Sequence, residues 1–510
     1  MKVFQVIYCS IILSLSLVAQ PKTDWFNQSF NSGISAGADI NKSFELIGEK
    51  QLAKVIVAVI DDGVDIYHDD FEGKIWVNQD EIPDNGVDDD ANGYIDDVHG
   101  WNFLGNPKGE NVKYETLELT RLYRQYSKIF ADRRRDSLRK EELQDYALYL
   151  EYKSVFEQEL VFVQDQFSEY AQLASLYKGA ISYYLDETGL IKVDPEELKK
   201  WNPESIDGQQ IKSFLLLAED EGLSESIEDG AEYFQAQLDY NLNVEFDPRT
   251  IVNDADLAVG YGNNMVYAED PGHGTHVAGI IAAVRDNGIG INGIAPNAVI
   301  MPLRAIPAGD ERDEDVALAI RYAVDNGARI INMSFGKSYS PDHELVNSAL
   351  KYAIKNDVLL VHAAGNDASD NDLVMNYPDG TFGKNKSAKT ILTVAAFNYS
   401  LKSSFLADFS NYGKNSVDFG APGVDIRSLA PENATKSQSG TSMAAPVVSG
   451  VAALLFGIDQ NLSAKKVKKI LLRTAHQVQT SRETGENSEI GKIRNSSCVS
   501  AERAIQFISK

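Results

Sequence analysis

Short apolar runs alternate along the chain with segments in which apolar residues recur at helical spacing. The apolar runs are rich in β-branched residues and cover 55–60, 299–303, 330–336, 358–364 and 391–396. Strands that are buried on both faces of a parallel sheet have this pattern. The helical segments cover 313–326, 344–355, 464–475 and 500–508. The alternation predicts an α/β fold, a doubly wound and mostly parallel sheet with helices on both faces.

A different pattern occupies residues 106–245, which we call the helical insertion. Its first part, 110–193, contains no proline, and apolar residues form helical stripes over 119–130 and 149–170. These stripes predict two long amphipathic helices, antiparallel to each other, whose aromatic residues pack as core. Shorter helices are predicted near 195–198, 211–217 and 231–234.

Residues 438–446 lead into 447–456, a segment with almost no polar side chain over more than two helical turns. This pattern predicts a helix that is buried on all sides, with Ser442 at its start. Small neighbours leave room for another molecule's backbone, and free amides at a helix start favour developing negative charge. Ser442 therefore suits a nucleophile. A Gly-Thr-Ser turn that only caps a core helix is the structural alternative.

The apolar run 55–60 ends at Asp61 and Asp62. Ligands of open α/β sheets bind at the carboxyl ends of such strands, so chemistry is expected at these carboxylates. A buried carboxylate that only caps the turn is the alternative interpretation.

Residues 271–282 place His273 at the head of a helix of small residues, with a glycine on either side. The glycines let this helix start close to another backbone. His276 lies one turn further along and is expected to be a structural core residue. Two histidines three residues apart could instead bind a metal, but no third ligand accompanies them.

These three segments resemble the aspartate, histidine and serine motifs of the subtilisin-like serine proteases, the subtilases. Their chain order, Asp, His, Ser, is the order of subtilisin and differs from that of chymotrypsin and the α/β-hydrolases. The resemblance implies that Ser442 is the nucleophile, His273 the general base and Asp61 the residue that orients it. Asp61 is preferred to Asp62 because the family usually has a neutral Ser or Thr at the second position.

The same resemblance implies roles for residues that contact the substrate. Asn366 resembles the family's side-chain donor of the oxyanion hole, with the Ser442 amide as the second donor. The edge segment that pairs with an extended substrate corresponds to Ser334, Phe335 and Gly336, and the other wall of the main pocket corresponds to Ala363, Ala364 and Gly365.

The predicted organisation has a catalytic domain in two parts, with the helical insertion between them. The segments are a signal peptide (1–19), an N-terminal extension with a helix at 40–47 (20–49), the first part of the catalytic domain (50–105), the helical insertion (106–245) and the second part (246–510). Both ends of the insertion must return to the catalytic face, because Asp61 and His273 have to meet. We therefore expect the insertion to cover the cleft or to dock a partner.

An acidic loop at 84–97 resembles an EF-hand-type calcium loop over nine positions. Its oxygen donors are predicted to be Asp88, Asp90, Asn92, Tyr94 through its carbonyl, Asp96 and Asp97. His99 stands where a bidentate Glu would close the site, and Asp97 is the expected replacement. This pattern predicts structural Ca²⁺. A solvated acidic loop is the alternative, although so many carboxylates would repel one another without a cation.

Composition and the N-terminus limit the partners and the location. The net charge of −27 over 510 residues argues against a nucleic-acid or anionic-membrane partner. Lys2 and the apolar segment up to Ala19 are typical of a secretory signal peptide, and a membrane anchor is the weaker alternative. After its removal no apolar run is long enough to span a bilayer, and Cys498 is the only thiol.

The hypothesis that unites these features is an exported serine endopeptidase, periplasmic or extracellular, that cleaves protein or peptide substrates. It uses the Asp/His/Ser triad and an Asn-assisted oxyanion hole. A non-catalytic scaffold that retains the subtilase core is one alternative, and the presence of all four catalytic residue types weighs against it. An esterase with the same triad is the other.

Overall fold

The computed structural model of the chain describes residues 24–31, 35–220, 223–252, 261–380, 382, 390–400, 404–478 and 491–510. The predicted signal peptide, residues 1–19, lies outside these ranges, as do residues 20–23 of the predicted N-terminal extension.

A nine-stranded sheet forms the centre of the described structure. Its strands, in spatial order, are β12 (His476–Gln477), β13 (Ser497–Cys498), β9 (Phe419–Pro422), β8 (Ile391–Phe397), β7 (Leu359–Ala363), β6 (Ile330–Met333), β3 (Val55–Asp61), β5 (Ala298–Arg304) and β4 (Trp101–Asn102). All neighbouring strands run parallel except β12 and β13. The predicted doubly wound, mostly parallel sheet is confirmed.

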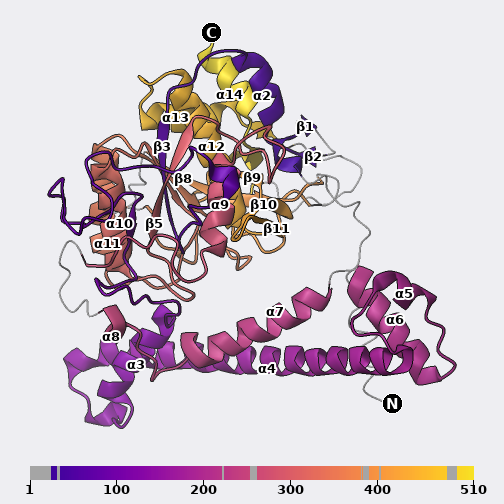
Figure 1. The fold of residues 1–510 in the computed structure, drawn as a ribbon. Helices are drawn as coiled ribbons and strands as arrows, with labels where there is room; N and C mark the ends of the chain where they lie inside the picture. The colour runs from indigo at the N-terminus through magenta and orange to yellow at the C-terminus, as the bar shows by residue number, and fades with distance from the viewer. Residues whose placement is uncertain are drawn as a thin grey trace.

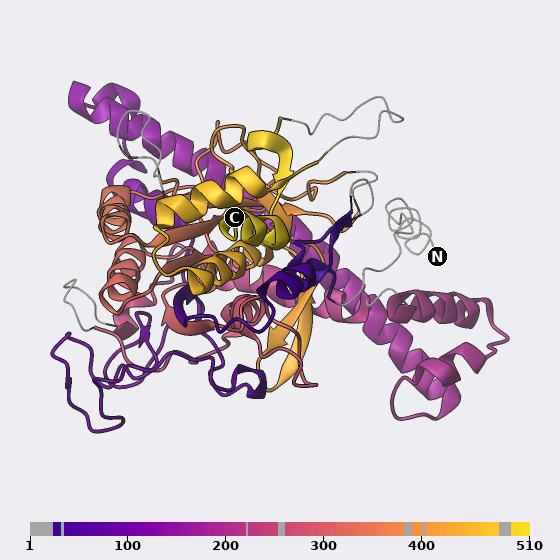
Figure 2. The same cartoon turned by 90° about the horizontal axis from the view of Figure 1, so that it is seen from above.

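Helices cover both faces of this sheet (Figures 1 and 2). The helices α9 (Gly272–Ala282) and α12 (Thr441–Ile458) share one hydrophobic core with Val57 and Val59 of β3. The helices α10 (Asp313–Asp325) and α11 (His343–Lys355) share another core with Ala58 and Ile60. Successive side chains of a strand point to opposite faces, so a strand that is apolar throughout contributes to both cores.

The helix α12 is buried on all sides, as its apolar sequence predicts. Within the described ranges it is also the one helix long and apolar enough to cross a bilayer, and 89% of that stretch is buried inside the structure. The predicted helices at 40–47, 464–475 and 500–508 are present as α2 (Ile40–Ile47), α13 (Ala464–Thr474) and α14 (Ala501–Ile508). These three helices lie together at one end of the core (Figure 1).

One predicted strand is shorter in the structure. β6 ends at Met333 and not at Gly336, because β3 and β7 pair with it only as far as Met333. Residues 334–336 therefore lie beyond the carboxyl end of β6. The apolar pattern also did not predict the antiparallel hairpin of β10 (Ile426–Ala430) and β11 (Ala434–Gln438), or the small pair β1 (Phe30–Asn31) and β2 (Ser35–Ala36).

Besides two short 3-10 turns at 135–137 and 140–142, the described part of the helical insertion contains five α-helices and a π-helical turn. They are α3 (Glu118–Phe130), α4 (Leu143–Thr188), α5 (Pro195–Lys200), α6 (Ile206–Asp220), α7 (Leu223–Ala236) and the turn Gln237–Asn241, and α8 (Arg249–Val252) follows. As predicted, α3 and α4 are antiparallel: Tyr123 stacks on Phe156 with 4.5 Å between ring centroids, and Phe130 contacts Tyr146 at 5.7 Å. α4 has 46 residues and extends well past the predicted stripe, until Gly189 ends it with φ of 71°.

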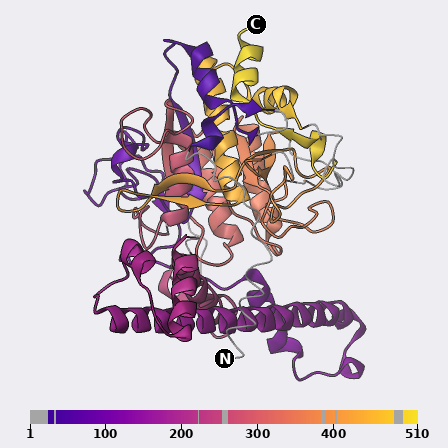
Figure 3. The same cartoon turned by 90° about the vertical axis from the view of Figure 1, so that its right-hand side faces the viewer.

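The insertion lies along one end of the core (Figures 1 and 3). Tyr152 of α4 contacts Tyr339, which follows β6, with 5.5 Å between ring centroids. Asp229 of α7 pairs with Lys436 of β11 at 3.5 Å. Burial and the nearby carboxylate of Asp367, which follows β7, raise the pKa of Glu159 on α4. The insertion is therefore close to the edge of the sheet where the predicted site residues lie.

Candidate active site

Asp61 and His273 meet at the carboxyl edge of the sheet. Asp61 is the buried last residue of β3, and His273 is the second residue of α9. His273 Nδ1 lies 2.6 Å from Asp61 Oδ1, a contact that favours the tautomer with its proton on Nδ1. The other ring nitrogen, Nε2, is then the one that can accept a proton.

A glycine allows α9 to start this close to β3. A Cβ atom on Gly274 would lie 2.0 Å from the Gly63 carbonyl oxygen and 2.9 Å from Asp61 Cβ. A larger residue would push the start of α9 away from the end of β3 and separate His273 from Asp61. The glycine of the motif is therefore required by the close approach of two backbones.

The charges around His273 favour its protonated form. Burial opposes that charge, but the Asp61 carboxylate, its hydrogen bond and the charge of Asp62 outweigh burial and raise the pKa of His273 to about 9. Burial and the charge of Asp61 raise the pKa of Asp62 to about 7. The imidazolium that forms when His273 takes a proton is thus stabilised by this environment.

His276 has structural contacts, in agreement with its predicted place in the core. The residue is buried, and its Nε2 lies 2.9 Å from the Ile426 carbonyl oxygen and 3.0 Å from that of Lys436. Burial lowers the pKa of His276 to about 4, so the ring is neutral near pH 7. Both contacts reach the β10–β11 hairpin, which argues against a metal site shared with His273.

Ser442 is the second residue of α12 and lies against the predicted substrate edge. Its Oγ donates to the Ser334 carbonyl oxygen at 3.0 Å, and Ser334 Oγ donates to the Ser442 carbonyl oxygen at 2.9 Å. No hydrogen bond joins Ser442 to His273 in the described part of the chain. Catalytic hydrogen bonds often align only when substrate binds, and rotation of the Ser442 side chain would free its hydroxyl from Ser334.

Asn366 is held so that its side-chain N–H group stays available. Asn366 Oδ1 accepts from Thr441 N at 2.9 Å and from Thr441 Oγ1 at 3.0 Å. Asn366 Nδ2 and Ser442 N both lie 3.6 Å from the position that a Cβ atom on Gly440 would take. Two N–H donors therefore lie around one position beside the serine, and an oxyanion hole needs this arrangement.

The two predicted walls of the substrate pocket lie on either side of Asn376, a residue that the sequence did not single out. Asn376 Nδ2 donates to the Ala364 carbonyl oxygen at 3.0 Å. A Cβ atom on Gly336 would lie 2.5 Å from Asn376 Oδ1, and one on Gly365 would lie 3.3 Å from Asn376 Nδ2. The amide of Asn376 therefore separates the segments 334–336 and 363–365.

Buried charges connect the helical insertion to this edge. Lys337 follows Gly336, and its Nζ lies 2.9 Å from Glu118 Oε2 and 2.9 Å from Asp313 Oδ1. Glu118 is the first residue of α3 and also pairs with Arg121 at 2.6 Å. Burial opposes ionisation of Glu118, but Arg121 and Lys337 outweigh it and lower its pKa to about 2.

The two ends of the insertion meet at the same place on the core. Glu115 N donates to the Ala308 carbonyl oxygen at 3.2 Å, and Ala308 N donates to the Lys113 carbonyl oxygen at 2.8 Å. Asn241, at the end of the π-helical turn, donates to the carbonyl oxygens of Glu115 and Ala308 at 2.7 and 2.9 Å. The insertion is thus a lobe with a fixed base next to the substrate edge.

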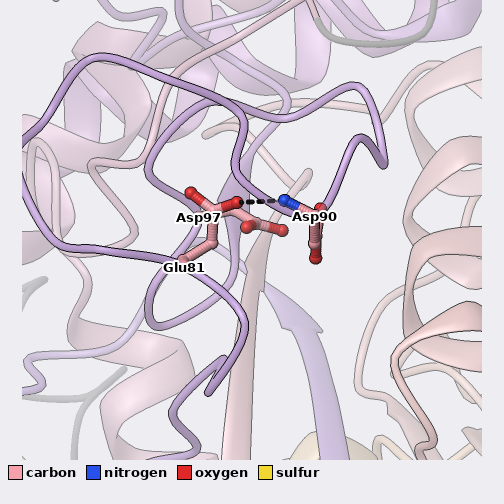
Figure 4. A group of neighbouring side chains, drawn as sticks. All are labelled: Glu81, Asp90 and Asp97. Atoms are coloured by element: carbon pink, nitrogen blue, oxygen red, sulfur yellow. Dashed lines mark hydrogen bonds between the residues drawn. The ribbon is translucent and has the colours of Figure 1, made fainter.

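The acidic loop brings together a set of carboxylates that differs from the predicted one. Oxygen atoms of Glu81, Asp90 and Asp97, which we call the carboxylate cluster, lie within 4.8 Å of one another (Figure 4). Burial raises the pKa of Glu81 and of Asp97, and the charge of Asp90 raises both further. Glu81 precedes the EF-hand-like segment, so the spacing of that segment could not identify it.

The side chains of the other predicted ligands make hydrogen bonds within the loop or pack in the core, and the carbonyl of Tyr94 stays a predicted donor. Asp88 and Asp96 each accept hydrogen bonds from two backbone amides of the loop, at 2.9 to 3.0 Å. The side-chain amide of Asn92 donates to two members of the carboxylate cluster, at 3.0 Å each. The ring of Tyr94 is buried in the core beside α10.

Comparison with known proteins agrees with this fold and geometry. A family model described as the subtilase family matches residues 222–492, which is more than half of the chain. The matched range contains His273, Asn366 and Ser442. Asp61 lies outside it, before the helical insertion.

The chain is 39% identical over 221 residues to the "Cell wall-associated protease" of Bacillus subtilis (strain 168), a stretch that covers 43% of this chain and 23% of that protein. It is 38% identical over 228 residues to the "Thermophilic serine proteinase" of Bacillus sp. (strain AK1), covering 44% of this chain and 52% of that protein. It is 32% identical over 254 residues to "Subtilisin DY" of Bacillus licheniformis, covering 48% of this chain and 88% of that protein. The match thus spans about a quarter of the first relative's length, about half of the second's and most of the third's. By the family match and this similarity, the chain belongs to the subtilase family.

Proposed function

We propose that this chain is a serine endopeptidase that hydrolyses peptide bonds with Asp61, His273 and Ser442. The observation that carries the proposal is the 2.6 Å contact between His273 Nδ1 and Asp61 Oδ1, next to the helix α12, whose second residue is Ser442. Membership of the subtilase family supports the same reaction.

In this reaction His273 Nε2 takes the hydroxyl proton of Ser442 while Oγ bonds to the carbonyl carbon of the substrate. The carbonyl oxygen becomes an oxyanion, and the amides of Asn366 and Ser442 donate hydrogen bonds to it. When the tetrahedral intermediate collapses, the C–N bond breaks and His273 gives its proton to the leaving amine. Water then hydrolyses the acyl-enzyme with His273 again as the base, and Asp61 holds the ring in one tautomer throughout.

The substrate would bind as an extended strand along residues 334–336. This segment lies beyond the paired part of β6, and the amide and carbonyl of Gly336 have no hydrogen-bond partner among the described residues. An extended peptide can pair with such a segment through its main chain. One side chain of the peptide would then point toward Asn376, between the two walls of the pocket.

The helical insertion would restrict which proteins reach this site. It contacts Tyr339, which follows the segment 334–336, and Lys436 of β11, whose carbonyl oxygen contacts His276 of α9. A folded domain has little room to approach between those contacts, whereas an extended chain needs only the width of a strand. The second candidate role is partner docking, and it predicts binding to the insertion without a change in substrate choice.

A structural Ca²⁺ ion at the carboxylate cluster is part of the proposal. Glu81, Asp90 and Asp97 offer hard oxygen donors within 4.8 Å of one another, and these donors suit calcium. The raised pKa values of Glu81 and Asp97 support it, because a cation would stabilise charges that burial and neighbouring carboxylates disfavour. The ion would hold the loop between β3 and β4 in place and would take no part in the peptide chemistry.

We also propose that the protein is exported and acts in the periplasm or outside the cell. The N-terminal sequence is typical of a signal peptide, and one relative is named a cell wall-associated protease. N-terminal sequencing of the protein recovered from the culture medium or periplasm would find cleavage near Ala19 if this is correct.

Labelling with a fluorophosphonate probe tests the catalytic proposal. The wild-type protein is expected to be labelled at Ser442, and Ser442→Ala, which removes one oxygen atom, is expected to stay folded and unlabelled. A folded wild-type protein that neither reacts with the probe nor cleaves peptides would favour the scaffold hypothesis. Faster hydrolysis of esters with no hydrolysis of amides would favour an esterase.

A further inference from the structure

The helix that carries His273 begins without a capping residue of its own. Pro271 precedes α9 and provides no side-chain hydrogen bond to the helix. The first amides of a helix have no partner within the helix, and a buried amide without a partner destabilises the fold. The start of α9 therefore needs an acceptor from elsewhere in the chain.

Asp62 is that acceptor. Its Oδ2 accepts from His273 N at 3.0 Å, and its Oδ1 accepts from Gly274 N at 2.7 Å. A carboxylate at a helix N-terminus is favoured both by these hydrogen bonds and by the helix dipole. Asp62 directly follows β3 and comes 211 residues before His273 in the sequence, so the cap also fixes α9 to the end of the strand.

The adjacent residues Asp61 and Asp62 thus hold the same histidine in two ways. Asp61 contacts the ring through Nδ1, and Asp62 contacts the backbone amide of the residue. Two other charges lie near Asp62: the buried guanidinium of Arg304 on β5, and the exposed carboxylate of Glu269, which acts on Arg304 together with Asp62. The position therefore combines three carboxylates, one imidazole and one guanidinium.

We propose that Asp62 is a positioning residue for the general base: it fixes the first turn of α9 and places a second carboxylate beside the ring of His273. This inference rests on the proposed function, in which His273 is protonated during turnover. The hydrogen bonds of Asp62 go to the backbone amides of His273 and Gly274, so its effect passes through His273. A small displacement of that ring lowers the rate far more than it lowers substrate affinity.

Three substitutions separate the cap from the charge. Asp62→Asn keeps a side-chain oxygen that can accept from one helix amide and removes the charge. Asp62→Ala removes both, and Asp270→Asn is the control, because it removes an equal charge from an exposed residue just before α9. The readouts are kcat and KM on a peptide p-nitroanilide between pH 5 and 10, and NMR titration of the His273 ring in a Ser442→Ala background, which needs no turnover.

Asp62→Ala is expected to lower kcat by about tenfold to a hundredfold with little change in KM, the size of effect that a displacement of about 1 Å produces. Asp62→Asn is expected to have a higher kcat than Asp62→Ala. It is also expected to move both the acid limb of kcat/KM and the titration of the His273 ring to lower pH, by up to about one unit. The direction follows because the imidazolium loses a neighbouring negative charge. Asp270→Asn is expected to leave kcat and KM within twofold of wild type.

The inference is overturned if both Asp62 variants keep the wild-type kcat, pH profile and ring titration while Ser442→Ala is inactive. In that case the proposed function stands without it. If Asp62→Ala does not fold, Asp62→Asn decides through the ring titration. Fluorophosphonate labelling measures the fraction of active sites in each variant. If kcat falls only as much as this fraction falls, Asp62 stabilises the fold and does not position His273.

Discussion

Lys337 Nζ lies 2.9 Å from Glu118 Oε2, and this contact joins the substrate edge to the first residue of α3. The side chain of Lys337 is 1% exposed, so water screens the pair little. The helical insertion is therefore not an appendage on a flexible linker, because its base forms part of the wall that positions residues 334–336.

Replacing Glu118 by Gln is expected to lower the free energy of unfolding by about 3 kcal/mol at pH 7. The pKa of Glu118 is about 2 in the folded protein, against an ordinary value of 4.5, and each unit corresponds to about 1.36 kcal/mol. Because the folded pKa lies below the ordinary one, this stabilisation is present above about pH 4.5 and is lost as the pH falls through about 2. Urea unfolding of both proteins at several pH values from 3 to 7 measures the difference.

For Lys337, the partner of Glu118, the contribution to stability depends on pH in the opposite direction. Burial opposes the charge of Lys337, but Glu311, Glu118 and Asp313 outweigh it and raise its pKa above the ordinary 10.5. Its stabilisation is therefore present below that value and is lost as the pH rises through the raised pKa. Lys199→Gln, in an exposed pair with Glu196, is the control and should change stability by less than about 1 kcal/mol. Equal effects of Glu118→Gln and Lys199→Gln on the free energy of unfolding would contradict this account.

Replacing Asn366 by Leu is expected to lower kcat far more than it changes KM, because its N–H donor acts mainly on the oxyanion. A loss of about a hundredfold to a thousandfold has been measured for the corresponding change in subtilisin, a member of the same family. Asn366 also accepts from Thr441 Oγ1, so Thr441→Val is the control for that bond. Steady-state kinetics on one peptide substrate should show a much smaller loss for Thr441→Val. A comparable loss would assign the effect of Asn366 to packing.

The fold could be predicted from the sequence because burial leaves a clear pattern in it. β3 packs against helices on both faces, so all its residues before Asp61 are apolar, and the run 55–60 is recognisable in the sequence itself. The end of β6 could not be predicted in this way. Residues 334–336 continue the pattern, but no neighbouring strand pairs with them.

The site could be predicted where its residues belong to local motifs. His273 and Ser442 each start an apolar helix among small residues, and Asp61 ends an apolar strand. Asn376 and Glu81 act through contacts between loops, and no local pattern marks such residues. Asp62 was visible in the sequence as a second carboxylate, but its bond to the His273 amide depends on how β3 and α9 meet.

Calcium is expected to raise the unfolding temperature, and a chelator is expected to lower it. An ion that binds the folded loop and not the unfolded chain adds about 2.7 kcal/mol at a free concentration one hundred times its Kd. Calorimetry with and without calcium measures this difference, and Asp90→Asn with Asp97→Asn should abolish it.

Two further variants distinguish the carboxylate cluster from the EF-hand-like set. Glu81→Gln should abolish the calcium effect, because Glu81 belongs to the cluster. Asp88→Asn should lower stability equally with and without calcium, because Asp88 accepts backbone amides of the loop. The reverse result would favour the EF-hand-like ligands. No effect of chelator on the wild type would mean that the loop is a solvated acidic turn.

The role of the helical insertion can be tested without disturbing its base. Leu117 N and Thr120 Oγ1 both donate to the Asn241 carbonyl oxygen, so the chain near residue 121 lies close to the chain near residue 240. Replacing residues 122–239 by a short Gly/Ser linker therefore removes most of α3 and all of α4 to α7, but keeps Glu118 and its contact with Lys337. A second variant, Glu118→Gln in the same background, tests whether the retained base still holds the edge.

We expect this shortened protein to cleave small peptides at nearly the wild-type rate, because the triad, Asn366 and the segment 334–336 all lie outside the deleted part. Folded proteins should be cleaved faster, since the helices near Tyr339 and Lys436 no longer limit their approach. The comparison uses one peptide p-nitroanilide and two forms of one protein, native and unfolded, as substrates. Loss of peptide cleavage by a folded deletion variant would make the insertion part of the active site itself. If the ratio of the cleavage rates of native and unfolded protein is unchanged, the insertion does not select substrates. Binding partners recovered only with the intact insertion would then identify it as a docking lobe.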